Sequence, residues 1–193
     1  LYELFYRNRF SPNNYTGIDI RKKTIENNML KFPKANWIEK DIVKGDFPKN
    51  NWDLIVSFEV MEHIGKNNGD VFLKNIRDAM NENTVFLVSS PRYDEKIGAA
   101  KNHTFDSGNG IEVQEYTYQE MKTLLEKHFV ITEKYGTFIS QKDFKDKMNE
   151  HQFYMFEELK KYYDSNLLSN LFAPMFPEYS RNCIWKCKKV INS

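Results

Sequence analysis

The sequence lacks the features that mark membrane, secreted and disulfide-stapled proteins. No apolar run approaches the roughly 20 residues of a membrane span, and no signal peptide is visible. Only two cysteines occur, Cys183 and Cys187. They lie four apart in one predicted strand, roughly 13 Å from each other, which is too far for a disulfide. We therefore expect a cytoplasmic protein with reduced core thiols and no membrane partner.

The sequence also has no marked excess of positive or negative charge. The chain has 28 basic and 27 acidic residues, so its formal net charge is +1. This balance gives no global signal for nucleic acid or for an anionic membrane. Internal repeats, linkers and low-complexity tracts are absent as well, so the 193 residues are predicted to form a single domain, 1–193.

Strand and helix patterns alternate along the chain. Strands are predicted at 15–20, 35–42, 52–58, 84–90, 129–138 and 181–191. Helices are predicted at 21–32, 69–80 and 118–128, with a helical lid or insertion at about 141–172. Residues 91–116 have no regular pattern and are predicted to be irregular. This alternation is typical of an α/β fold with a mostly parallel sheet.

Acidic residues follow two successive strands, and ligands of such sheets bind beyond the carboxyl ends of the strands. Asp19 can accept two hydrogen bonds from a ribose diol, and Asp41 can accept one from an exocyclic amine. Ile20 and Ile42 follow these acids and could pack on an adenine ring. Taken alone, each acid is better explained as a helix N-cap or a turn residue. Together, at successive strand ends, they favour a nucleoside site.

The stretch SFEVMEH, residues 57 to 63, places two carboxylates and a histidine directly after an apolar run. If a helical turn begins there, Glu59, Glu62 and His63 share one helix face at positions i, i+3 and i+4. With His103 as a further ligand, they would suit Mg²⁺ or Mn²⁺.

Several of these segments together resemble the class I S-adenosylmethionine-dependent methyltransferases, over nearly the whole chain. They are YTGIDI, EKDI, WDLIVSFEVMEHI, VFLVSSP and the closing strand. The third is the most specific and resembles the branch that includes ubiquinone-biosynthesis O-methyltransferases. The resemblance implies a Rossmann-like methyltransferase sandwich, a mostly parallel sheet with an antiparallel last strand, and S-adenosylmethionine as cofactor. The implied cofactor contacts are Asp19, Ile20, Asp41, Ile42, Phe58 and Glu59.

The family's first strand and glycine-rich loop have no counterpart in the sequence. LYELFYRNRF, at residues 1 to 10, resembles the helix that follows that loop. We therefore expect an additional N-terminal segment in the native chain, and a gap in the middle of a sheet that lacks the first strand.

The function predicted from the resemblance is S-adenosylmethionine-dependent methylation, of a hydroxyl group on a small molecule or sugar. Glu59, His63 and His103 are the candidate catalytic residues, since a histidine can accept the hydroxyl proton. A metal could lower the pKa of that hydroxyl, and the E-x-x-E-H pattern also resembles the metal site of small-RNA 2′-O-methyltransferases. Many methyltransferases of this fold carry an acid and a histidine here without any metal.

Two further functions remain alternatives. One is a metal-dependent 2′-O-methyltransferase of RNA ends, so a nucleic-acid acceptor is left open. The other is a non-catalytic scaffold or partner subunit with this fold. A nicotinamide-dependent oxidoreductase is disfavoured, because no suitably placed Tyr-x-x-x-Lys pair is evident. The sequence leaves the acceptor and the oligomeric state open.

Overall fold

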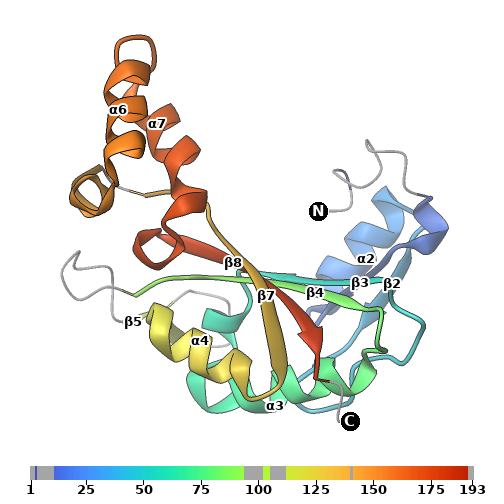
Figure 1. The fold of residues 1–193 in the computed structure, drawn as a ribbon. Helices are drawn as coiled ribbons and strands as arrows, with labels where there is room; N and C mark the ends of the chain where they lie inside the picture. Colours follow the sequence, from blue (N-terminus) through green and yellow to red (C-terminus); the bar gives the residue numbers. More distant parts are fainter. Residues whose placement is uncertain (1–2, 4–10, 94–101, 105–111, 140, 191–193) are drawn as a thin grey trace. The chain divides into compact units, whose positions relative to one another are not determined.

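The computed structural model describes residue 3 and residues 11–93, 102–104, 112–139 and 141–190 (Figure 1). The chain divides into two compact units, residues 1–47 and residues 48–193, and each is described by itself. In the described residues, no helix is long and apolar enough to cross a membrane.

The first unit is a small parallel strand pair with one helix. Its elements are η1 (Pro12–Asn14), β1 (Thr16–Asp19), α2 (Lys22–Lys31) and β2 (Asn36–Glu39). The Trp37 ring packs directly on Gly17, where a Cβ atom would lie 2.1 Å from a ring carbon. The indole nitrogen donates to the carbonyl of Phe32, 3.1 Å away, just past the end of α2. Glycine is therefore required at position 17 for the helix to close on the strand pair.

The second unit is built on a four-stranded sheet. Its strand order is β3 (Leu54–Phe58), β4 (Val85–Pro91), β8 (Asn182–Lys189) and β7 (Phe129–Gly136). β3 and β4 are parallel, whereas β8 lies antiparallel between β4 and β7. The α/β fold with an antiparallel last strand is thus confirmed. Among the described residues, β3 pairs with β4 alone and β1 with β2 alone.

Helices α3 (Lys66–Ala79) and α4 (Tyr118–Glu126) cover one face of this sheet (Figure 1). Phe72, Leu73 and Ile76 of α3 are buried, the spacing of one helix face. A capping box begins α4, since Thr117 and Glu120 exchange hydrogen bonds. The core therefore lies between these helices and the buried side chains of β4 and β8.

Strand β8 contributes alternate residues to that core. Cys183, Trp185 and Cys187 are all buried, as the two-residue period of a strand requires. Both cysteines are free thiols, as predicted. Burial raises the pKa of each thiol to about 12, so both stay protonated at neutral pH.

The stretch 91–116 was predicted to be irregular. This prediction is wrong in part, because some of its residues pair as strands. β5 (Asn102–Thr104) and β6 (Glu112–Gln114) form an antiparallel pair, and β6 lies against the 3₁₀ helix η2 (Met61–His63). Arg92 and Tyr116 form a further bridge. Three-residue strands are too short to give a periodic sequence signal, so pairing rather than pattern defines them.

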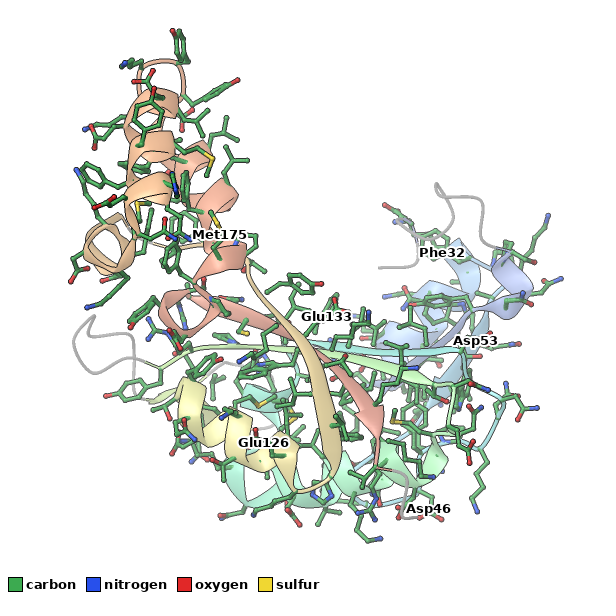
Figure 2. All side chains as sticks on the ribbon, in the orientation of Figure 1. Phe32, Asp46, Asp53, Glu126, Glu133 and Met175 are labelled. Atoms are coloured by element: carbon green, nitrogen blue, oxygen red, sulfur yellow. The ribbon has the colours of Figure 1, made fainter. Side chains whose placement is uncertain are left out.

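Residues 141–179 form a helical segment with its own aromatic core. Its elements are α5 (Gln141–Phe144), η3 (Lys145–Lys147), α6 (Glu150–Leu159), α7 (Ser165–Phe172), η4 (Ala173–Met175) and η5 (Pro177–Tyr179). Phe144 stacks on Phe172 and Phe176, and Phe156 meets the same cluster edge-on. Figure 2 shows many other side chains of α6 and α7 pointing outward from this helix pair. This helical segment therefore has a hydrophobic cluster of its own within the second unit.

Candidate functional site

The end of β3 carries an unusual backbone conformation. Glu59 has a φ of 54°, the only positive φ of a described residue other than glycine. Its N–H donates to the carbonyl of Ser89 on β4, 3.1 Å away. Its carboxylate accepts from the Ser89 hydroxyl at 2.6 Å and from the Asn182 amide at 2.8 Å. Three strands thus converge on this one carboxylate.

This conformation overturns the predicted i, i+3, i+4 arrangement. The left-handed backbone at Glu59 ends the strand, and the 3₁₀ helix η2 begins two residues later, at Met61. Glu59 therefore does not share a helix face with Glu62 and His63. Within the described residues, no group of three His, Cys, Asp or Glu side chains is placed to hold a metal. The predicted Mg²⁺ or Mn²⁺ site does not fit the three of its ligands that are described.

Glu62 is buried directly beneath this turn, with 3% of its surface exposed. Ser90 donates to its carboxylate over 3.3 Å, and the His63 Nε2 lies 3.7 Å from its other oxygen. Burial, together with the negative charges of Glu59 and Glu115, raises the pKa of Glu62 to about 7. The exposed His63 ring therefore lies beside a carboxyl group whose pKa is raised toward neutral.

His103 is placed by its backbone alone, as its side chain lies outside the described residues. It pairs with Val113, and Val113 is buried on the strand that lies against η2. The β5–β6 pair thus holds the backbone of His103 one strand away from the segment that contains Glu62 and His63.

In the first unit, Asp19 and Asp41 follow neighbouring parallel strands. Asp19 ends β1, while β2 ends at Glu39, so Asp41 lies two residues beyond its strand rather than at its end. Asp19 accepts from the N–H of Arg21 at 2.8 Å, and Asp41 accepts from the N–H of Val43 at 2.9 Å. Both acids therefore do form turns, the alternative considered from the sequence.

These turn bonds leave both carboxylates able to bind a ligand. A carboxylate has about four acceptor positions, and the bonds to Asp19 and Asp41 use only some of them. The side chain following Asp19 is Ile20, an apolar residue with 54% of its surface exposed. Ile42 is partly buried. An exposed isoleucine beside a carboxylate suits a nucleoside, which offers both a flat ring and a diol.

Phe58, the predicted cofactor contact in the second unit, is the last residue of β3, and 37% of its surface is exposed. The Phe58 ring is therefore available for contact with a ligand. The next residue in the chain is Glu59, which has the left-handed backbone.

Sequence reasoning missed the polar residues that support these acids. Asn182 on β8 gave no signal, because its partner Glu59 lies 123 positions earlier. Glu115 is buried and accepts from the Arg181 guanidinium through both oxygens. The Arg92 guanidinium donates to the carbonyls of Tyr179 and Ser180. The adjacent serines at 89 and 90, which end an apolar strand, were the one visible clue.

The sheet order and its acidic carboxyl end define a class of protein. An antiparallel strand between two parallel neighbours, with the acids beyond the strands, is the arrangement of Rossmann-like methyltransferases. A family model described as a methyltransferase domain matches residues 1–158. The chain belongs to this family.

Solved structures agree with that fold. A TehB-like S-adenosylmethionine-dependent methyltransferase from Corynebacterium glutamicum has a TM-score of 0.56 and 15% identity, covering 91% of this chain and 67% of its own. An O-methyltransferase from a Brevibacillus brevis polyketide multienzyme, in complex with S-adenosyl-L-homocysteine, has a TM-score of 0.52 and 22% identity, covering 91% and 58%. A Burkholderia thailandensis 1,6-didemethyltoxoflavin-N1-methyltransferase has a TM-score of 0.55 and 11% identity, covering 91% and 61%.

The chain therefore spans about three fifths to two thirds of the length of these three proteins. A comparison with curated protein sequences gives no match. The ubiquinone-biosynthesis branch stays a prediction, because the family model describes methyltransferase domains in general.

Proposed function

We propose that this protein transfers the methyl group of S-adenosylmethionine to a hydroxyl oxygen of a small molecule or sugar. Membership of the methyltransferase family supports the cofactor. The single observation that carries the reaction is the group of polar side chains at the carboxyl end of β3 and β4. There a strained, doubly hydrogen-bonded Glu59 lies close in sequence to a buried Glu62 and an exposed His63.

The proposed cofactor contacts are those predicted from the sequence. Asp19 and Asp41 would accept hydrogen bonds from the ribose and the adenine amine, and Ile20, Ile42 and Phe58 would supply apolar contacts. When bound, S-adenosylmethionine supplies an electrophilic methyl group on a positively charged sulfur. The chain's own residues then have to orient the acceptor oxygen in line with that group and to take up its proton.

His63 is the proposed proton acceptor. Its Nε2 lies 3.7 Å from the Glu62 carboxylate, so a negative charge behind the ring would stabilise the imidazolium that forms. His63 would take up the proton of the acceptor hydroxyl as the oxygen receives the methyl group that the bound cofactor would supply. Glu59 is proposed to orient the cofactor or the acceptor, and His103 remains a further candidate in the same role as His63.

Transfer to oxygen is supported by one of the similar structures, which is an O-methyltransferase. Another acts on nitrogen, so the fold alone does not select the acceptor atom. The helical segment 141–179 and the β5–β6 region are proposed to select the acceptor, because both follow strands whose ends face the site.

Binding of S-adenosylhomocysteine to the full-length protein tests the proposal. We expect the thermal midpoint to rise with ligand concentration, since a ligand that binds only the native state stabilises it. Asp41→Ala should weaken binding by roughly tenfold, the loss of one hydrogen bond to a charged group. Asp46→Ala is the matched control, because Asp46 is an exposed acid in the same unit. No shift at millimolar ligand would refute the proposal.

A further inference from the structure

The carboxylate of Glu59 is held by protein donors before any ligand arrives. A residue with a side chain adopts a left-handed backbone only when its surroundings impose it, and such strain clusters at functional sites. Here the imposed conformation comes with three hydrogen bonds: the Glu59 N–H donates to the Ser89 carbonyl, and the Ser89 hydroxyl and the Asn182 amide donate to the Glu59 carboxylate. The backbone and both carboxylate oxygens of Glu59 are therefore tied to neighbouring strands.

These bonds leave room for a ligand on the same group. Ser89 bonds one carboxylate oxygen and Asn182 bonds the other, so each oxygen keeps a further acceptor position. The Glu59 side chain is exposed, so a ligand can reach its carboxylate. A ligand hydroxyl or amine could thus bond a carboxylate whose direction is already set.

Asn182 is itself rigidly placed. It is the first residue of β8, where it pairs with Pro91 of β4, and its carbonyl accepts from the N–H of Thr137 at 3.0 Å. The preceding residue, Arg181, donates to both oxygens of the buried Glu115. The Asn182 amide therefore reaches Glu59 from a residue that is paired with β4 and hydrogen-bonded to the residue after β7.

We propose that Asn182 is a positioning residue, which holds the Glu59 carboxylate toward a hydroxyl or amine of the bound cofactor. The inference rests on the proposed function, because it assigns a role to a residue of the same site. In this proposal β8, the antiparallel strand of the fold, takes part in ligand binding. It does so through Asn182, which contacts Glu59 and not the ligand. Ser89 supplies the second donor and cannot by itself fix both oxygens.

Calorimetric titration of the full-length protein with S-adenosylhomocysteine tests this role. Asn182→Ala should weaken binding about tenfold, because a hydrogen bond that orients a charged group is lost. Asn182→Asp keeps the shape of the side chain and replaces the donor by a carboxylate facing Glu59. It should weaken binding further, since like charges repel at this distance. It also serves as the second variant if Asn182→Ala does not fold.

The matched control is Gln119→Ala, which removes an exposed amide that donates to Thr123 on α4, 3.2 Å away. This variant should bind as the wild type does. A double-mutant cycle separates positioning from general structure. If Asn182 acts through Glu59, then Glu59→Ala combined with Asn182→Ala should bind no more weakly than Glu59→Ala alone.

The outcomes distinguish the two proposals. Failure of the wild-type protein to bind S-adenosylhomocysteine overturns the proposed function and this inference with it. Normal wild-type binding, with Asn182→Ala equal to Gln119→Ala, overturns only the role of Asn182. Strictly additive losses in the double variant also overturn it, because they would show that Asn182 acts independently of Glu59.

Discussion

Replacing Glu62 by glutamine should stabilise the protein at alkaline pH and have little effect in acid. Glu62 is 3% exposed, and its pKa is raised from 4.5 to about 7, chiefly by burial. An amide has nearly the same shape as a protonated carboxyl and carries no charge at any pH. The substitution therefore removes the burial of a negative charge without creating a cavity.

The magnitude follows from proton linkage. The native state binds the Glu62 proton more tightly than the unfolded state, so below pH 4.5 both states are protonated and the residue contributes no pH dependence. As the pH rises from 4.5 to 7, the unfolded state ionises first and the free energy of unfolding falls. A shift of this size corresponds to a loss of about 3 kcal/mol, complete above pH 7.

Guanidinium unfolding at a series of pH values from 4 to 8 measures this effect. The difference in unfolding free energy, Glu62→Gln minus wild type, should rise by about 3 kcal/mol across that range. Glu82→Gln, at an exposed turn position, controls for the change in net charge. A difference that stays constant with pH, or that falls toward alkaline pH, would refute the reasoning about burial.

Three other substitutions test the fold around the site. Gly136→Ala would place a Cβ atom 2.3 Å from the carbonyl oxygen of Ala173 and against the Ser180 hydroxyl, so we expect a loss of about 3 kcal/mol in unfolding free energy. Chemical denaturation gives this value, and a change below about 0.5 kcal/mol would contradict the packing at the base of the helical segment. Thr117→Ala removes the capping box of α4 and should cost about 1 kcal/mol, seen as a lower thermal midpoint. Because φ is 54° at Glu59, Glu59→Gly should be about 1 kcal/mol more stable than Glu59→Ala in urea unfolding, and equal stability would argue against a left-handed backbone there.

Much of the fold was predictable because local patterns and tertiary packing agree. The run around Ile55 and the run around Phe86 are nearly all apolar, and both form strands of the sheet in the second unit. Thr117 and Glu120 begin a helix through hydrogen bonds within four residues, which is a local signal of the capping box in the structure. Such signals need no knowledge of distant residues.

The site was predicted only in part. The positions of the acids at the ends of β1 and β3 could be predicted from where the strands end. The turn at Glu59 was predicted to be helical, because the residues around it favour a helical turn as much as a left-handed one. The left-handed backbone there depends on Ser89 and Asn182, which lie 30 and 123 positions away. The metal interpretation rested on three side chains sharing one helix face, and the described residues do not have that arrangement.

The sequence by itself determined the alternation of strands and helices, the two separated free thiols, and the acids that follow the strands. These properties depend on hydrophobic period, on chain geometry and on chemistry within a few residues. Tertiary structure alone decided that Glu62 is buried, that Glu59 has a left-handed backbone and that Asn182 donates a hydrogen bond to it. Each of these depends on contacts between strands that are far apart in the chain, and a local pattern carries no information about such contacts.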